Sequence, residues 1–231
     1  MINSTIELPK ITAELPAPVL ANPMLPALPL SETYMMDCIA GMKEYPDKWF
    51  DLAVVDPPYS LSIENSGTMF KKFGNTKGWD NEKPSYEYFI ELFRVSKNQI
   101  IWGGNYFIEN LKSTKCIIWW DKMNGTNMMA DGEMAWTSFD KHSKRFQMHH
   151  FSKGYDDKIH PCQKPTKLYE WCYQNFTEEG QRILDTHLGS GSSRIAAHKN
   201  KLNFVGFEID KEYFDKQEKR FANYVCQPRL F

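Results

Sequence analysis

The amino-acid sequence predicts an α/β fold, with a mostly parallel, twisted sheet covered by helices on both faces. Three observations point to it. Short apolar runs alternate along the chain with longer segments of helical periodicity. The run 52–55 is apolar at every position, which is typical of a strand buried on both faces. Acidic residues directly follow three apolar runs, at Asp56, Asp185 and Glu208, where open α/β sheets build their ligand sites.

The expected elements begin after an N-terminal arm. Residues 1–30 hold six of the 13 prolines and few charges, so we expect an extended arm followed by one domain over 31–231. The expected strands are 52–55, 99–102, 116–120, 133–137, 182–184 and 203–207. The expected helices are 84–97, 165–176, about 191–200 and about 211–223, two of them beginning at or just after a proline. The stretch 60–83, rich in Gly, Ser and Asn, is expected to be a long loop insertion, a length usual for functional lids or disordered segments.

The segment Asp56-Pro57-Pro58-Tyr59 follows the buried run 52–55 and is the first candidate site. Its two prolines remove two backbone N–H donors and stiffen the turn, so that bare carbonyl acceptors lie beside the carboxylate. An aromatic ring follows at once. Such a corner accepts hydrogen bonds from an amino group and stacks a flat ring, as binding the exocyclic amine of a nucleobase requires. The structural alternative is a rigid turn in which Asp56 caps a helix and Tyr59 joins the core.

The second candidate site is the segment 182–193, which reads as a strand, a glycine turn and the start of a helix. Glycines let the backbone approach a ligand closely, and a helix N-terminus offers free N–H groups. The third glycine of the dinucleotide fingerprint and a phosphate-binding lysine are both missing, which disfavours NAD and ATP. Glu208 is placed to bind two ribose hydroxyls, and Asp185 to pair with a ligand ammonium. An adenosyl group that carries an amino acid and a sulfonium fits these two acids; the alternative is a helix cap and an exposed glutamate.

Together these motifs resemble the S-adenosylmethionine-dependent DNA amino-methyltransferases, which act on adenine N6 or cytosine N4. The resemblance covers about residues 34–223, and the target-base motif precedes the glycine motif, as in the permuted β-type order of that family. It implies a circularly permuted class I (Rossmann-like) methyltransferase fold, S-adenosylmethionine as cofactor and DNA as partner. The segment 34–38 resembles the family's acidic turn, whose aspartate contacts the cofactor adenine. The segment 160–165 resembles the family's helix-opening segment beside the methionine end of the cofactor.

The resemblance and the residue chemistry together assign two sets of site residues. The catalytic set is Asp56, Pro57, Pro58 and Tyr59. The cofactor-binding set is Asp37, Cys38, Asp56, Gln163, Lys164, Asp185, His187, Gly189, Ser190, Gly191, Ser192 and Glu208. The family usually has Pro and Phe where this chain has Thr186 and His187, so an aromatic cofactor contact is replaced by imidazole or lost.

Charge distribution suggests where nucleic acid would bind. The net charge of −1 is uninformative, but residues 65–79 and 141–153 combine positive charges with aromatic rings and contain no acid. That mixture suits phosphate contact and base stacking, although two solvated loops would look the same. The expected contacts are Lys71, Lys72, Lys77, Lys141, Lys144 and Arg145. The stretch near 138–159 is short, so we expect a small basic recognition region rather than a large recognition domain.

Adenine N6 is the expected target, because family members with Asp at the first position of the Asp-Pro-Pro-Tyr motif mostly methylate adenine and those with Ser there mostly methylate cytosine. A base paired in a duplex is out of reach, so the base is expected to flip out. The alternatives are N4-cytosine methylation, RNA adenine methylation, methylation of a protein amide, and a non-catalytic nucleic-acid-binding subunit. The protein-amide enzymes usually begin this motif with Asn, which counts against that alternative.

The remaining features bound the setting. Five scattered cysteines without a CxxC pair indicate reduced thiols in a cytoplasmic protein. His149, His150, His160 and Cys162 match no common metal-binding spacing, so no metal is expected. No apolar run is long enough for a membrane span. The resemblance suggests a restriction–modification setting, and both a homodimer and a nuclease partner stay open.

Overall fold

The computed structural model describes residues 30–60, 82–125, 130–149 and 158–226. The expected N-terminal arm lies outside these residues except for its last residue. Most of the expected 60–83 insertion also lies outside, together with Lys71, Lys72 and Lys77. Within the described part of the chain, no helix is long and apolar enough to cross a membrane.

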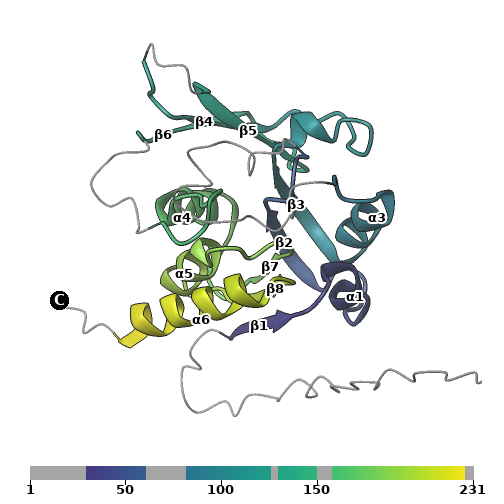
Figure 1. The fold of residues 1–231 in the computed structure, drawn as a ribbon. Helices are drawn as coiled ribbons and strands as arrows, with labels where there is room; N and C mark the ends of the chain where they lie inside the picture. The colour runs from purple at the N-terminus through teal and green to yellow at the C-terminus, as the bar shows by residue number, and fades with distance from the viewer. Residues whose placement is uncertain (1–29, 61–81, 126–129, 150–157, 227–231) are drawn as a thin grey trace, which may run out of the picture.

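An eight-stranded sheet forms the centre of the molecule, with strand order β1-β8-β7-β2-β3-β5-β4-β6 (Figure 1). The strands are β1 (Ser31–Met35), β2 (Phe50–Val55), β3 (Ser96–Trp102), β4 (Ile117–Asp121), β5 (Gly132–Thr137), β6 (Lys144–Gln147), β7 (Arg182–Asp185) and β8 (Asn203–Glu208). Strand β5 pairs antiparallel with both of its neighbours, whereas all other pairs are parallel. The predicted mostly parallel sheet is therefore confirmed.

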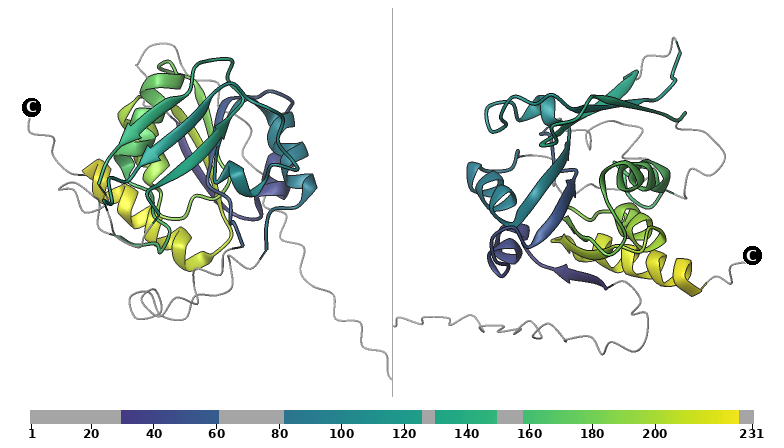
Figure 2. Two further views of the ribbon diagram at one scale, coloured as in Figure 1. Left: turned by 90° about the horizontal axis from the view of Figure 1, so that it is seen from above. Right: turned by 180° about the vertical axis from the view of Figure 1, so that it is seen from behind.

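Helices cover both faces of the sheet. They are α1 (Cys38–Lys43), α3 (Tyr86–Val95), α4 (Thr166–Phe176), α5 (Ser192–Lys199) and α6 (Lys211–Cys226), with a 3-10 turn η2 (Gly104–Tyr106) after β3. Helices α1 and α3 lie on one side of the central strands and α4, α5 and α6 on the other (Figures 1 and 2). This arrangement agrees with the layered architecture that the alternating pattern predicted.

The predicted strands and helices all occur, with shifted ends. Helix α3 stops at Val95 rather than at residue 97, because Ser96 and Lys97 already belong to β3. Among the described residues, β1, α1, β6 and the 3-10 turn η2 were not predicted. Strand β6 forms inside the expected basic recognition region by pairing with β4, a contact that the local sequence pattern does not reveal.

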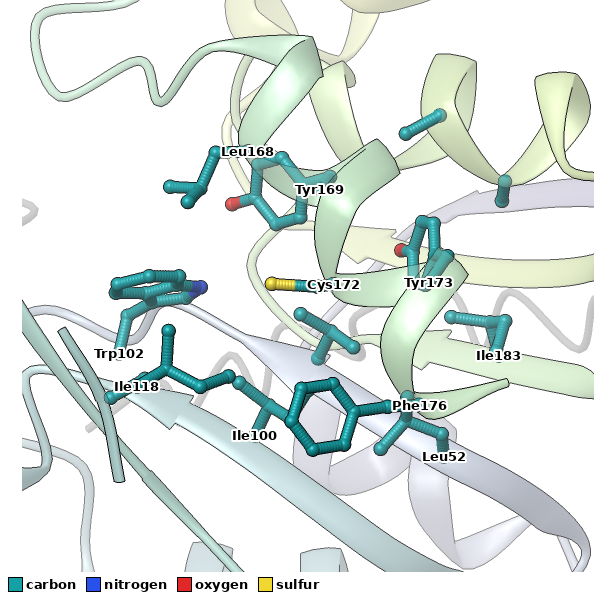
Figure 3. Packing of buried hydrophobic residues seen from close by; sticks show 14 of the residues in the cluster. Leu52, Ile100, Trp102, Ile118, Leu168, Tyr169, Cys172, Tyr173, Phe176 and Ile183 are labelled. Carbon is teal, nitrogen blue, oxygen red and sulfur yellow. The ribbon is translucent and has the colours of Figure 1, made fainter. Parts of the chain in front are cut away.

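Two apolar clusters, one on each face, hold the layers together. Strand β2 contributes to both: Leu52 and Val54 pack with α4 and α5, whereas Ala53 and Val55 pack with α1 and α3. The cluster under α4 is shown in Figure 3, where Phe176 of α4 lies next to Ile100 of β3 and Leu52 of β2. All four strand residues are at most 1% exposed, as expected of a strand buried on both faces.

The parallel strands bring the candidate residues to one edge. Strand β2 pairs with β7, and β7 with β8, so that these three strands end side by side. The Asp-Pro-Pro-Tyr corner, the glycine turn and Glu208 therefore share the carboxyl edge of the sheet. Strands β4 and β6 run in the same direction as β2. Their first residues therefore lie at the amino ends of the parallel strands, opposite the carboxyl edge.

Candidate active site

Asp56 follows β2 directly, and both of its carboxylate oxygens are engaged. Lys164 Nζ lies 2.6 Å from Oδ2, and the Tyr59 hydroxyl donates to Oδ1. The side chains of Asp56 and Lys164 are only 15% and 5% exposed. Burial raises the pKa of Asp56, and the adjacent Lys164 ammonium acts in the opposite direction. The corner therefore holds a buried carboxylate in an ion pair, which supports a site more than a simple helix cap.

Tyr59 is fixed by an aromatic neighbour and a glycine. Its ring stacks on Tyr106, with centroids 4.9 Å apart and an interplanar angle of 20°. A Cβ atom on Gly103 would lie within 3.0 Å of the Tyr59 ring, and Gly103 also has a positive φ of 66°. Position 103 therefore requires glycine. The structure shows Tyr59 packed within the protein, so its stacking on a target base stays a prediction.

Lys164 also contacts a second carboxylate that the sequence did not point to. Its ammonium lies 3.1 Å from Glu133 Oε2 on β5, and Glu133 in turn pairs with Lys122 after β4. Although burial opposes charge here, the two lysines lower the pKa of Glu133 to about 2. Burial likewise disfavours the charged form of Lys164, but Asp56 and Glu133 raise its pKa above the ordinary value. A signal existed: Glu133 is an acid at the start of an apolar run.

Asp185 ends β7 next to β2 and is almost completely buried, at 1% exposure. Its carboxylate accepts a hydrogen bond from the Ser193 hydroxyl and one of 3.1 Å from the His187 backbone N–H. Burial raises the pKa of Asp185 to about 7, although these two hydrogen bonds act to lower it. A buried acid in this state is suited to receive a cationic group of a ligand.

Glu208 ends β8 and is bound to the glycine turn. Its Oε2 accepts a hydrogen bond of 2.8 Å from the Gly189 N–H, and its Oε1 accepts one of 2.9 Å from the Asp210 N–H. Gly189 and Gly191 both have positive φ, 50° and 70°, and Gly191 directly precedes α5. The turn therefore needs glycine at both positions. The hydrogen bond from Gly189 to Glu208 holds this turn next to the end of β8. Ser190 and Ser192 are buried in this turn, with their hydroxyl oxygens 3.1 Å apart.

Asp37 and Cys38 lie at the same edge, because the Met36 N–H donates to the Glu208 carbonyl over 3.1 Å. Asp37 caps α1 by accepting a 2.9 Å hydrogen bond from the Ala40 N–H. Burial, with a smaller contribution from Asp37, raises the pKa of the Cys38 thiol to about 12. Cys38 therefore stays a neutral thiol near neutral pH.

The segment 160–164 packs over the glycine turn. The His160 ring lies 3.7 Å from the position of a Cβ on Gly189 and meets Tyr213 edge-on, at 4.3 Å between centroids. Burial lowers the pKa of His160 to about 3. Gln163 is buried and accepts a 3.0 Å hydrogen bond from the Ile159 N–H. No group of three His, Cys, Asp or Glu side chains among the described residues could hold a metal ion.

Thr186 and His187, where the chain departs from the family pattern, form a hydrogen-bonded chain with Tyr88 that is buried at Thr186 and half-buried at His187. Thr186 Oγ1 lies 2.8 Å from the Tyr88 hydroxyl and 2.9 Å from His187 Nδ1. The Tyr88 and His187 rings meet at 63° with centroids 5.5 Å apart. Burial lowers the pKa of His187 to about 4, so the imidazole is neutral. The imidazole is thus held in place from α3, by a tyrosine that the sequence did not single out.

Of the basic residues expected to contact nucleic acid, Lys141, Lys144 and Arg145 are described, and they do not lie at this edge. Lys141 and Lys144 line a hollow of about 560 Å³ at the start of β6, beyond the opposite edge of the sheet. The hollow is completed by Lys115, Asp140, His142 and Ser143. Arg145 is exposed on β6 next to them. In the sheet, β3, β5 and β4 lie between β6 and β2, the strand that Asp56 follows, and the contact of these residues with DNA stays a prediction.

Known proteins are similar to this chain in sequence and in fold. The chain is 26% identical to the Type II methyltransferase M2.MboI of Moraxella bovis, and the match covers 81% of this chain and 86% of the relative. It is also 26% identical to the Type II methyltransferase M.HinfI of Haemophilus influenzae, and that match covers 83% of this chain and 68% of the relative. The M1.HpyAVI–SAM complex has a TM-score of 0.56 at 21% identity, covering 82% of this chain and 98% of that one. PvuII DNA methyltransferase, described as cytosine-N4-specific, has a TM-score of 0.58 at 14% identity, covering 88% and 89%.

The two structural likenesses concern the fold, and they agree with the predicted Rossmann-like methyltransferase architecture. The family model described as DNA methylase matches residues 101–219, more than half of the chain. This match spans Glu133, Lys164, the glycine turn and Glu208. The prediction of an S-adenosylmethionine-dependent DNA amino-methyltransferase is confirmed, and the chain belongs to the DNA methylase family.

Proposed function

We propose that this protein transfers a methyl group from S-adenosylmethionine to the N6 amino group of adenine in DNA, with the base flipped out of the duplex. One observation carries the proposal. Asp56 and Asp185 end two directly paired strands, so the amine acceptor and the cofactor turn lie side by side at one sheet edge. In-line transfer requires this closeness, because positioning supplies most of the acceleration.

The residues at the turn fit the cofactor. Asp185 is a buried acid with a raised pKa, and a ligand ammonium would supply the counter-charge that it lacks. Glu208 keeps unused lone pairs on both oxygens, which suits two ribose hydroxyls. Asp37 lies at the end of β1 beside them, where the resemblance places the adenine. When bound, S-adenosylmethionine supplies the electrophilic methyl group.

Asp56 and the Pro57 carbonyl would bind the target amine. The lone pair of an exocyclic amine is delocalised into the ring, so the free amine is a poor nucleophile. If Asp56 and the Pro57 carbonyl each accept one N–H, the nitrogen is favoured in a pyramidal form aimed at the methyl group. Asp56 or solvent takes the released proton. Transfer is direct, and the enzyme forms no covalent bond to the base.

The base has to leave the duplex to reach Asp56, which is only 15% exposed. Extrusion costs a few kcal/mol. Stacking of the base on Tyr59 would offset on the order of 1–3 kcal/mol of this. The proposal includes closure of the segment 60–83 over the nucleotide, with Lys71 and Lys72 on phosphates. These two lysines and most of the segment lie outside the described residues.

Adenine is proposed over cytosine because Asp, not Ser, stands at position 56. Relatives of known fold include a cytosine-N4-specific enzyme, so the product is what distinguishes the two. Mass spectrometry of nucleosides from DNA treated with the protein should detect N6-methyladenine. If the product is 4-methylcytosine instead, the target is the N4 amino group of cytosine and the adenine assignment is wrong. Competition between duplex DNA and RNA would separate DNA from RNA methylation.

Asp56→Ala and Asp56→Asn test the site. Both should abolish methyl transfer while leaving S-adenosylmethionine binding, measured by calorimetry, close to that of the unchanged protein. Asp51→Asn is the matched control, because Asp51 lies on the same strand at the other end and pairs with Lys97. Retained turnover in the Asp56 variants would refute the role of Asp56. Absence of cofactor binding by the unchanged protein would favour a non-catalytic subunit.

A further inference from the structure

We propose that Glu133 is a positioning residue for methyl transfer, which holds the Lys164 ammonium and thereby the Asp56 carboxylate in the orientation that receives the target amine. The inference rests on the proposed function and deepens it. Glu133 itself does not contact the target amine. It acts through Lys164.

The three partners of Lys164 carry the argument. An ammonium has three N–H donors. Lys164 Nζ lies 2.6 Å from Asp56 Oδ2, 3.1 Å from Glu133 Oε2 and 3.3 Å from the Tyr59 hydroxyl oxygen. Two of these contacts are ion pairs, so attraction to both Asp56 and Glu133 sets the position of the ammonium. Loss of the charge on Glu133 removes one of the two attractions and lets the ammonium shift.

Because Lys164 is buried, the position of its ammonium depends on these protein partners. Lys164 is 5% exposed, so water is poorly placed to replace a lost acceptor. Its ammonium also lies 5.5 Å from the centroid of the Trp102 ring, an apolar wall of the core. A buried ammonium that loses one carboxylate should move toward the other, which here is Asp56. Such a movement displaces the carboxylate that receives the amine.

Glu133 is itself held from the opposite side. Lys122 pairs with its other oxygen, so that charges alternate from Lys122 through Glu133 and Lys164 to Asp56. Glu133 lies on β5 opposite Trp120 of β4, and Lys122 directly follows β4, where its N–H donates to the Asp131 carbonyl. The chain of ion pairs therefore connects strands β4 and β5 to the Asp-Pro-Pro-Tyr corner. Among the described residues, the charge pairs of Glu133 are with Lys164 and Lys122 and not with Asp185 or Glu208, the proposed partners of the ligand ammonium and ribose, so loss of Glu133 should affect cofactor binding less than methyl transfer.

The test compares Glu133→Gln, Glu133→Asp and the matched control Glu91→Gln. Gln keeps the size of the side chain and removes its charge, whereas Asp keeps the charge and shortens the reach. Glu91 is a partly buried carboxylate paired with Arg94 on α3, outside the Lys164 network. For each variant, kcat and KM for duplex DNA, the Kd of S-adenosylmethionine by calorimetry, and the thermal unfolding midpoint are measured.

Glu133→Gln should lower kcat roughly 10- to 100-fold, as expected of a misplaced catalytic group, with KM and cofactor Kd changed by less than about two-fold. Glu133→Asp should recover a large part of kcat, and Glu91→Gln should leave kcat unchanged. Equal kcat in Glu133→Gln and the unchanged protein would overturn the inference. So would a loss of kcat matched by equal losses in Glu91→Gln, because it would reflect general destabilisation. If Glu133→Gln does not fold, Glu133→Asp is compared with Lys164→Met instead. A folded Glu133→Asp whose kcat is no higher than that of Lys164→Met would also overturn the inference.

The same measurements separate this inference from the proposed function. If the unchanged protein binds S-adenosylmethionine but methylates no DNA, the proposed function fails first. If the unchanged protein is active and Asp56→Asn is not, but Glu133→Gln keeps full kcat, only the role of Glu133 fails.

Discussion

Asp185 should make the ligand-free protein less stable as the pH rises. Burial raises the pKa of this carboxyl from 3.8 to about 7 in the folded protein. Between these two values the folded state keeps the proton that the unfolded state has lost. Stability therefore falls with rising pH in that window, at about 1.4 kcal/mol per pH unit. Over the three units of the shift this amounts to about 4 kcal/mol, of which roughly 2–3 kcal/mol lies between pH 5 and pH 8.

Asp185→Asn isolates this contribution. The amide keeps the size of the side chain, its oxygen still accepts from the His187 N–H, and the Ser193 hydroxyl can rotate to accept from the amide nitrogen. Free energies of unfolding are measured by urea titration for both proteins without cofactor at several pH values from 5 to 8. The variant should gain about 2–3 kcal/mol relative to the unchanged protein between pH 5 and pH 8. It should also bind S-adenosylmethionine more weakly, because the proposed partner of the ammonium has lost its charge.

Asp51→Asn is the control with the opposite sign. Although burial acts to raise it, the pKa of Asp51 is lowered by the Arg182 N–H and by Lys97. The stabilisation from Asp51 is therefore fully present above the pKa of about 4 that its carboxyl has in the unfolded state. It is lost only as the pH falls through the lower pKa of the folded state. The difference between Asp51→Asn and the unchanged protein should stay flat from pH 5 to pH 8. A flat difference for Asp185→Asn as well would refute the reasoning, because the buried carboxyl would then already be ionised at pH 5.

Two further variants test how the corner is built. Gly103→Ala should lower the free energy of unfolding by about 2–5 kcal/mol, because it adds a left-handed φ penalty and a clash with the Tyr59 ring. Gly125→Ala is its control, with a φ of 64° and nothing within 4 Å of the added Cβ, and should lose only about 1–2 kcal/mol in the same urea titration. Lys164→Met removes the cation that opposes the effect of burial on the pKa of Asp56, with Glu133 and Tyr59 still facing that carboxyl. Any residual kcat/KM should then have its acidic limb at higher pH, and an unchanged limb would contradict the ion pair with Asp56.

The sequence by itself determined the layered α/β architecture and the position of the site within it. The run 52–55, the glycine turn 189–191 and the acids at strand ends are local patterns, and each depends on the chemistry of a few neighbouring residues. Once the strands are parallel, Asp56, Asp185 and Glu208 have to meet at one edge. The ends of α3 were less predictable, because β3 begins at Ser96 without an intervening loop.

Only the tertiary structure decided which groups complete the site. Lys164 meets Tyr59 across 105 positions of sequence, and Tyr88 meets Thr186 across 98, distances over which local periodicity carries no information. Strand β6 depends on pairing with β4, and that pairing places Lys141 and Lys144 away from Asp56. Glu133 reaches Lys164 because β5 runs antiparallel to β3, which brings its first residues to the carboxyl edge. Strand direction and register, set by packing of the whole chain, therefore selected the partners of the acids that the sequence had already placed.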